Sequence, residues 1–270
     1  MARTDGMGRL LRLDGRCGMI TGSGSGIGRE TALLAARQGA AAGLLSRDPD
    51  EIRDLVGEIE DAGGTAMSIP GDISKPEKMD EAYRSLVDKW GRLDFVVANA
   101  GVNGVWAPIE ELEPDEFRKT VEINLIGTFL TIKYAVPYLK RQGGSVVIVS
   151  SINGTRVFSN SGATAYSSTK AAQVAMAKML ALELASERIR VNVICPGAIS
   201  TSIDENTNRR NLEKAREPAE YPAGTVPLTG GEPGTAEEVA HLIFFLLSDA
   251  SRHISGTEMW IDGAQSLLQG

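Results

Sequence analysis

Tyr166 and Lys170 lie four residues apart in the run Ala165-Tyr166-Ser167-Ser168-Thr169-Lys170, where a loop gives way to a long helical pattern. Residues four apart share one helix face, so the ammonium would lie beside the phenol and stabilise its anion. At about 5 Å and an effective dielectric of about 20, this attraction is roughly 3 kcal/mol and lowers a phenol pKa by about two units. The pair could therefore exchange a proton near neutral pH, as a general acid or base does. Among the five tyrosines, this one alone has a lysine at that offset.

A glycine-rich turn precedes this pair by about 140 residues. It reads Thr21-Gly22-Ser23-Gly24-Ser25-Gly26-Ile27-Gly28, follows an apolar strand-like run and opens a helical pattern. Glycines let the backbone bend sharply and approach a pyrophosphate, whose charge then meets the amides of the helix N-terminus. The alternative is a flexible Gly/Ser loop. No Gly-Lys-Ser/Thr follows, which excludes a Walker loop, and the strand and helix on either side favour a dinucleotide-binding turn that includes Gly22, Ser25, Gly26, Ile27 and Gly28.

Short apolar runs alternate with longer amphipathic runs along the chain, and these elements must position the two motifs. The predicted strands are Cys17–Thr21, Ala41–Leu45, Ala66–Ile69, Phe95–Ala98, Val146–Val149, Val191–Ile194 and Met259–Ile261. The predicted helices are Arg29–Gln38, Glu51–Ala62, Pro76–Trp90, Glu116–Arg141, Thr169–Glu187 and Ala236–Ser248. This alternation predicts a doubly wound α/β domain with a parallel sheet covered on both faces. We expect residues 1–12 to be a flexible tail and residues 13–270 to be one domain.

Length and composition narrow the classes of function. The 270 residues suffice for one α/β domain, and the net charge of −7 with scattered basic residues argues against a nucleic-acid partner. Nothing resembles a signal peptide or an apolar membrane span, so the expected location is the cytoplasm. Cys17 and Cys195 lie in apolar runs and are expected to be buried thiols. His241 and His253 lack a second metal ligand at useful spacing, so no metal site is expected. The sequence has no G-x-S-x-G motif, which argues against a serine hydrolase.

Several motifs together resemble the short-chain dehydrogenase/reductase family. They are Thr21–Gly28, Asn99-Ala100-Gly101, Asn124, Ser151, Tyr166–Lys170 and Pro196-Gly197, in the order and rough spacing of that family. The resemblance covers residues 14 to 263. It implies a Rossmann-type, seven-stranded parallel sheet, a bound nicotinamide dinucleotide and reversible hydride transfer at a carbonyl or alcohol carbon.

The resemblance implies a role for each catalytic residue. Tyr166 would be the general acid/base, and Lys170 would lower its pKa and hydrogen-bond the nicotinamide ribose. Ser151 would orient the substrate oxygen and stabilise its developing charge, and Asn124 would hold a water that connects Lys170 to solvent. The interval from Ser151 to Tyr166 is slightly longer than is usual in the family, which leaves Ser150 and Asn153 as alternatives for the role of Ser151.

The end of the second predicted strand bears on which dinucleotide binds. NAD-preferring members of the family resemble each other in having an acidic residue there, whereas this chain has Ser46 and Arg47. The Arg47 guanidinium can hydrogen-bond a 2′-phosphate, so NADP is favoured and NAD is the alternative. The neighbouring Asp48 would weaken the positive potential of Arg47. Asp72, followed by Ile73, resembles the residue that accepts a hydrogen bond from adenine, but it could instead cap a loop. Asn99-Ala100-Gly101 resembles the turn that supports the central strand and the adenosine ribose.

The segment after the sixth predicted strand resembles the family's nicotinamide site. The segment begins with Pro196 and Gly197. By this resemblance, the Ile199 backbone and the Thr201 hydroxyl would hydrogen-bond the nicotinamide carboxamide. Residues 201–234 then form a long polar excursion, which we expect to be a substrate lid. Trp106 and Phe158 could form a wall of the substrate pocket.

Two functions follow from these patterns. The first is an NAD(P)-dependent oxidoreductase acting on a 3-oxoacyl thioester, a ketone, a steroid-like compound or a sugar alcohol. The alternative is a non-catalytic dinucleotide-sensing or scaffold protein of the same fold. The set Asn124, Ser151, Tyr166 and Lys170 favours the enzyme, since a binder would not require all four. The family further implies a homotetramer, or a homodimer, that pairs the helices predicted at Glu116–Arg141 and Thr169–Glu187.

Overall fold

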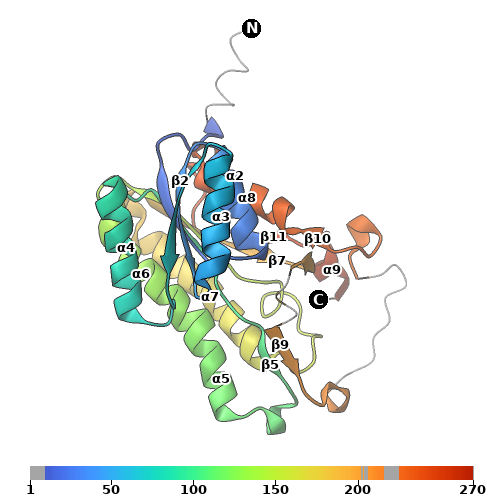
Figure 1. The fold of residues 1–270 in the computed structure, drawn as a ribbon. Helices are drawn as coiled ribbons and strands as arrows, with labels where there is room; N and C mark the ends of the chain where they lie inside the picture. The colour runs from blue at the N-terminus through green and yellow to red at the C-terminus, as the bar shows by residue number, and fades with distance from the viewer. Residues whose placement is uncertain (1–9, 202, 204–205, 216–224, 270) are drawn as a thin grey trace.

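A seven-stranded sheet forms the centre of the protein in a computed structural model that describes residues 10–201, 203, 206–215 and 225–269 (Figure 1). Every strand pairs in parallel, in the order β11-β7-β6-β4-β1-β2-β3. The strands are β1 (Cys17–Thr21), β2 (Ala41–Ser46), β3 (Thr65–Pro70), β4 (Phe95–Ala98), β6 (Gly144–Val149), β7 (Ile189–Pro196) and β11 (Glu258–Ile261). The predicted Rossmann-type sheet is therefore confirmed. Residues 1–9 of the predicted tail lie outside the described residues.

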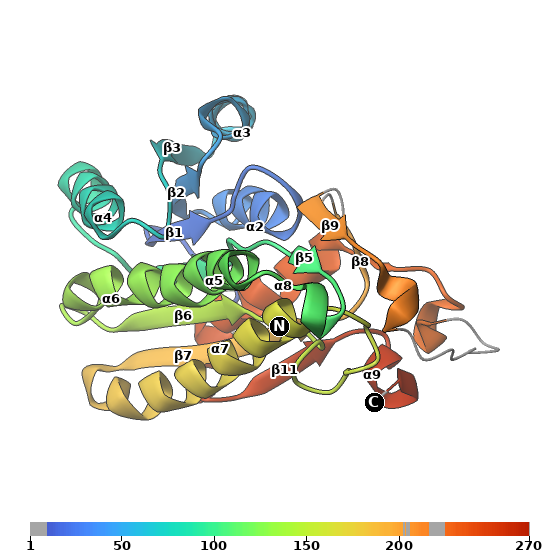
Figure 2. The same ribbon diagram turned by 90° about the horizontal axis from the view of Figure 1, so that it is seen from below.

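Helices cover both faces of this sheet (Figures 1 and 2). One face carries α2 (Gly26–Arg37), α3 (Pro49–Asp61) and α8 (Ala236–Leu247). The other carries α4 (Pro76–Trp90), α5 (Pro114–Val121), α6 (Gly127–Leu139) and α7 (Thr164–Glu183), and the short α9 (Gln265–Gln269) follows β11. Two buried apolar clusters, one on each face of the sheet, form the core.

The strands read as continuous apolar runs because both of their faces are buried. In β4, Val96 and Ala98 pack in the cluster under α4 and α6, whereas Phe95 and Val97 pack in the cluster under α2 and α8. Successive side chains of a strand point to opposite faces, so a sheet covered on both sides has no polar face. This is why no alternation of polar and apolar residues marks these strands.

The helix predicted at Glu116–Arg141 is interrupted. α5 ends at Val121, a π-helix (η2, Glu122–Ile126) follows, and α6 begins at Gly127. A π-turn widens the backbone by one residue and is frequent at functional sites, and here it contains Asn124. The residue pattern remains helical throughout, so periodicity could not reveal the interruption.

The helix predicted at Thr169–Glu187 begins earlier, at Thr164, and ends at Glu183, where η3 (Ala185–Glu187) follows. Its N-cap is Ala163, which has no side-chain hydrogen bond to the first turn. Without a Ser, Asp or Asn cap, the start could not be read from the sequence. Tyr166 therefore lies in the first turn of α7 and not at the predicted edge of a loop.

Two short pairs of strands and several single helical turns were not expected. β5 (Gly104–Trp106) pairs in parallel with β9 (Thr207–Arg209), and β8 (Ile199–Ser200) pairs with β10 (Gly234–Thr235). The short 3-10 turns are η1 (Ile109–Glu111), η5 (Leu212–Lys214), η6 (Pro227–Thr229) and η7 (Asp249–Ser251). Strands of two or three residues are too short for periodicity to detect. They fasten parts of the predicted lid to the body of the domain.

Cys17 and Cys195 are both buried and unbridged, as predicted. Within the described part of the chain, no helix is long and apolar enough to cross a membrane. The same residues contain no cluster of three His, Cys, Asp or Glu side chains that could hold a metal ion.

Candidate active site

The carboxyl ends of the strands meet at one edge of the sheet, and two connected pockets lie there. The glycine turn follows β1, Asn99 follows β4 and Ser150 follows β6. The outer pocket, of about 880 Å³, lies between the glycine turn and the ends of β2 and β3. The inner pocket, of about 100 Å³, lies between the ends of β6 and β7 and the start of α7. Both pockets share Ile27, Asn99, Gly101, Val102, Thr201 and Ile203, so one elongated ligand could occupy both.

Tyr166 and Lys170 face the inner pocket from successive turns of α7. The Lys170 ammonium lies 5.5 Å from the centre of the Tyr166 ring and donates a 2.9 Å hydrogen bond to the carbonyl oxygen of Val149. Both side chains are buried. Burial lowers the pKa of Lys170 to about 8, because the charged form loses its hydration. The lysine therefore lies beside the phenol, as the helical spacing predicts, and gains and loses its own proton near neutral pH.

The three candidates for the substrate-orienting residue differ in their contacts. Ser150 lines the inner pocket together with Ser151, but it donates its hydroxyl at 2.8 Å to the carbonyl oxygen of Lys170, which joins β6 to α7 and commits its proton. Ser151 lines the inner pocket and its hydroxyl oxygen accepts a 3.1 Å hydrogen bond from the Asn153 amide, so its proton can be donated into the pocket. Asn153 turns its side chain to Asn160 and does not line the inner pocket. This arrangement favours Ser151.

Asn124 uses its side chain to hold the main chain that follows β4. Its amide oxygen accepts from the Val102 amide at 2.8 Å, and its amide nitrogen donates to the Val102 carbonyl at 2.9 Å. The carbonyl oxygen of Asn124 itself accepts from the Gln173 side chain at 2.7 Å. Asn124 thus orients the residues between the two pockets, and its water-holding role stays a prediction.

The glycines of the turn are required by close approaches. A Cβ on Gly28 would lie 2.1 Å from the Gly22 carbonyl oxygen, and one on Gly22 would lie 2.8 Å from the Ala100 Cα. Gly22 also has φ +65°, a conformation that favours glycine. Asn99 braces the turn by donating to the carbonyl oxygens of Thr21 and Gly22 at 3.0 and 3.1 Å. The N-terminus of α2 consequently opens on the outer pocket, where its amides can meet an anion.

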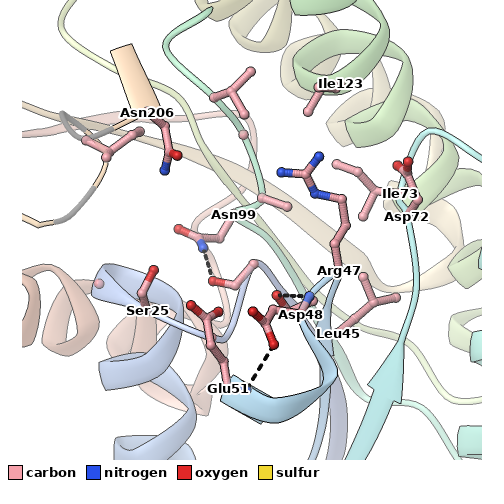
Figure 3. Close-up of a pocket in the computed structure, with 18 of the residues that line it drawn as sticks. Ser25, Leu45, Arg47, Asp48, Glu51, Asp72, Ile73, Asn99, Ile123 and Asn206 are labelled. Atoms are coloured by element: carbon pink, nitrogen blue, oxygen red, sulfur yellow. Dashed lines mark hydrogen bonds between the residues drawn. The ribbon is translucent and has the colours of Figure 1, made fainter.

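The other predicted dinucleotide residues line the two pockets. Ser46, Arg47, Asp72 and Ile73 line the outer pocket beside the ends of β2 and β3, and Asn99, Ala100 and Gly101 line it on the side of β4. Figure 3 shows Arg47, Asp72 and Ile73 at this pocket. Pro196, Gly197, Ile199 and Thr201 line the inner pocket. The sequence-predicted residues from seven separate segments are therefore brought together along one continuous groove.

Two carboxylates near Arg47 are engaged in local hydrogen bonds. Asp48 is the N-cap of α3 and accepts from the amides of Asp50 and Glu51 at 2.9 and 3.3 Å. Asp72 accepts at 2.9 Å from both the amide and the hydroxyl of Ser74. The capping alternative for Asp72 thus describes one of its oxygens, while the residue still lines the outer pocket.

The described part of the predicted lid is held close to Tyr166. The Arg210 guanidinium donates two hydrogen bonds, of 3.0 and 2.8 Å, to the Glu116 carboxylate. Trp106, in the strand that pairs with β9, has its ring centre 6.3 Å from that of Tyr166. Phe158 is largely exposed. Trp106 therefore lies beside the Tyr166 ring but lines neither pocket, and its role as a wall of the substrate pocket stays a prediction. Residues 202, 204–205 and 216–224 of the predicted lid lie outside the described residues.

Sequence reasoning missed several residues of the site. Val102, Ile123, Ile203 and Asn206 line the outer pocket without belonging to any motif. Gln173 reaches the π-helix from α7 and is buried. Glu51 lines the outer pocket from the first turn of α3, where its exposed position in an amphipathic helix predicts only contact with solvent. No local pattern marks these residues, since their positions depend on distant segments.

Comparisons with known proteins agree with this geometry. Residues 22–264 match the family model described as enoyl-(acyl carrier protein) reductase. The chain is 37% identical to the 3-oxoacyl-[acyl-carrier-protein] reductase of Thermotoga maritima, over 94% of this chain and 98% of that protein. It is similar to the crystal structure of a 3-ketoacyl-ACP reductase from Sinorhizobium meliloti 1021, with 52% identity, a TM-score of 0.90 and coverage of 93% and 99%. It also resembles the 3-ketoacyl-(acyl-carrier-protein) reductase of Brucella melitensis complexed with NADH, at 29% identity and a TM-score of 0.82, with coverage of 94% and 99%.

Proposed function

This chain belongs to the short-chain dehydrogenase/reductase family, and we propose that it is an NAD(P)-dependent oxidoreductase that interconverts a carbonyl and a secondary alcohol, with Tyr166 as its general acid/base. The observation that carries the proposal is the inner pocket, into which Tyr166, Lys170 and Ser151 converge next to the glycine turn. A scaffold protein would need the groove but would have no use for a buried lysine beside a tyrosine.

The residues present fit a nicotinamide dinucleotide. The outer pocket is open at the N-terminus of α2, where Gly22, Gly24 and Gly26 line it and a pyrophosphate can approach the main chain. Arg47 lines the part of the outer pocket where the adenosine half would lie, and Gly197, Ile199 and Thr201 line the inner pocket where the nicotinamide half would lie. When bound, the dinucleotide supplies the hydride.

The side chains of the inner pocket handle the proton and the substrate oxygen. In the reducing direction, the Tyr166 phenol donates its proton to the carbonyl oxygen, and in the oxidising direction the phenolate takes it back. Ser151 donates a hydrogen bond to the same oxygen and stabilises its developing negative charge. Lys170 stabilises the phenolate, and its lowered pKa lets it pass a proton onward. Asn124 keeps the Val102 segment in place between the two pockets.

The finer assignments are proposals of the same kind. We propose that NADPH is preferred, because Arg47 extends into the outer pocket and Asp48 is held at the start of α3 (Figure 3). We further propose that the protein assembles as a homotetramer or homodimer through the outer faces of α6 and α7, where Phe129, Met179 and Leu182 are exposed. The candidate substrates are a 3-oxoacyl thioester, a ketone, a steroid-like compound and a sugar alcohol, of which the first matches the name of the Thermotoga maritima relative.

The decisive experiment follows the dinucleotide by absorbance: NADPH oxidation with the carbonyl substrates (3-oxoacyl thioester, ketone and oxo-steroid) and NADP+ reduction with the sugar alcohol. Tyr166→Phe should keep the fold and cofactor binding but lose turnover by about 10²–10⁴-fold, because it removes the proton that catalysis transfers. Tyr134→Phe is the matched control, since it removes a phenol hydroxyl from α6 outside both pockets. Near-normal turnover in Tyr166→Phe would refute the catalytic assignment. Dinucleotide binding with no turnover on any substrate would favour the scaffold alternative.

A further inference from the structure

Glu51 presents a carboxylate to the outer pocket, in a place where the pattern at the end of β2 predicts none. Its side chain lies against Gly24 of the glycine turn: a Cβ built on Gly24 would be 2.0 Å from the Glu51 Oε2 and 3.1 Å from its Cβ. Glycine at position 24 is therefore what leaves room for this side chain. The contact joins the first turn of α3 to the phosphate-binding turn.

Glu51 and Arg47 point to different sides of the outer pocket. In Figure 3 the Arg47 guanidinium extends toward Ile73, Asp72 and Ile123, whereas the Glu51 carboxylate extends toward Ser25. Both residues belong to the described part of the chain, and no ion pair joins them. The two opposite charges consequently act on a ligand from separate directions and do not neutralise each other by direct contact.

The ribose of a bound dinucleotide would lie between these two charges. The pyrophosphate would lie at the glycine turn and the adenine at the end of β2. The adenosine ribose would therefore lie between Gly24 and Arg47. A carboxylate accepts hydrogen bonds from ribose hydroxyls, as the acidic residue at the end of the second strand typically does in NAD-binding sites. The same carboxylate repels a 2′-phosphate. Here the carboxylate comes from a different element, the first turn of α3.

We propose that Glu51 is a specificity-determining residue that opposes Arg47. Its carboxylate accepts hydrogen bonds from the ribose hydroxyls of NADH, and it weakens the binding of NADPH by repelling the 2′-phosphate. This inference rests on the proposed function. Its consequence is a pocket that accepts both dinucleotides, in which Arg47 favours the 2′-phosphate and Glu51 narrows that preference.

The test measures the dissociation constants of NADPH and NADH by fluorescence titration of the 270-residue protein. Glu51→Gln should raise the affinity for NADPH relative to NADH by about fivefold to tenfold, because it removes the repulsion and keeps a hydrogen-bonding side chain. Glu60→Gln is the matched control: it makes the same charge change on the exposed side of α3, about 13 Å farther along the helix and beyond the screening length at physiological salt. It should leave the ratio unchanged.

A second variant tests the position of the carboxylate. Gly24→Ala should push Glu51 off the glycine turn and raise the NADPH-to-NADH affinity ratio in the wild-type background, but it should have no effect on the ratio in the Glu51→Gln background. The ratio cancels any contact that the new methyl group makes with both dinucleotides alike. An unchanged ratio in Glu51→Gln, or an equal rise in Glu60→Gln, would overturn the inference while leaving the proposed function intact. Wild-type protein that binds neither dinucleotide would overturn the proposed function itself.

Discussion

Replacing the buried Lys170 by methionine should change how stability depends on pH. The ammonium is buried, its one hydrogen bond among the described residues goes to Val149, and no carboxylate there lies within ion-pair distance of it. Burial lowers its pKa from 10.5 to about 8. At about 1.4 kcal/mol per pKa unit, this lowering corresponds to about 3 kcal/mol of native-state destabilisation while the lysine is charged.

The sign follows from the proton count in each state. Between about pH 8 and pH 10.5 the unfolded chain keeps the proton on Lys170 and the native protein has lost it. The free energy of unfolding therefore rises with pH across this window. Below pH 8 both states hold the proton, and the native state carries the full penalty of a buried charge.

Lys170→Met removes this charge and keeps a long apolar side chain in its place. At pH 7 the variant should be more stable than wild type by about 2 kcal/mol, which is the 3 kcal/mol penalty less about 1 kcal/mol for the lost hydrogen bond to Val149. The gap should close at about pH 9.5, about 1.5 units above the native pKa, and by about pH 10.5 wild type should be the more stable by about 1 kcal/mol, which is the retained hydrogen bond to Val149. Urea unfolding of both proteins at a series of pH values measures the gap.

Lys119→Met is the control for this experiment, because Lys119 is exposed on α5 and the same substitution there removes no buried charge. A constant difference between wild type and Lys170→Met from pH 7 to pH 10.5 would show that burial does not lower the pKa of Lys170. The proposed proton-passing role of this lysine would then lose its physical basis.

Three other substitutions or measurements test the site and the assembly. Ser151→Ala should lower turnover by about 10²–10³-fold, because it removes a hydrogen bond to the developing oxyanion. Ser150→Ala should chiefly lower the thermal midpoint of unfolding, because it breaks the hydrogen bond to the Lys170 carbonyl. The reverse result would assign the substrate-orienting role to Ser150. Arg47→Ala should reduce the preference for NADPH over NADH by about tenfold to a hundredfold, and an unchanged affinity ratio would make this arginine a surface charge. Light scattering at micromolar concentration should show a tetramer or dimer, and Leu182→Glu, which places a charge on the exposed face of α7, should dissociate it; a monomeric wild type would contradict the proposed assembly.

The sequence by itself determined the order and type of the main elements. The bounds of β1, β4 and α4 agree with the predicted Cys17–Thr21, Phe95–Ala98 and Pro76–Trp90. Apolar runs and helical periodicity report burial on a local scale, and Pro76 and Gly91 mark the two ends of α4. The pairing of Tyr166 with Lys170 was equally readable, because four residues make one helical turn wherever that helix lies.

Tertiary structure decided which side chains the site contains. Ser150 and Ser151 are adjacent in sequence and both line the inner pocket, and only the packing of α7 against β6 commits the Ser150 hydroxyl to the Lys170 carbonyl and leaves the Ser151 hydroxyl proton for a ligand. Glu51 is an exposed helical residue by pattern, and only the path of the chain through Gly24 places it against the phosphate-binding turn. Periodicity reports whether a side chain faces water or the core. Its actual neighbours are set by segments far apart in the chain, whose relative positions no local pattern contains.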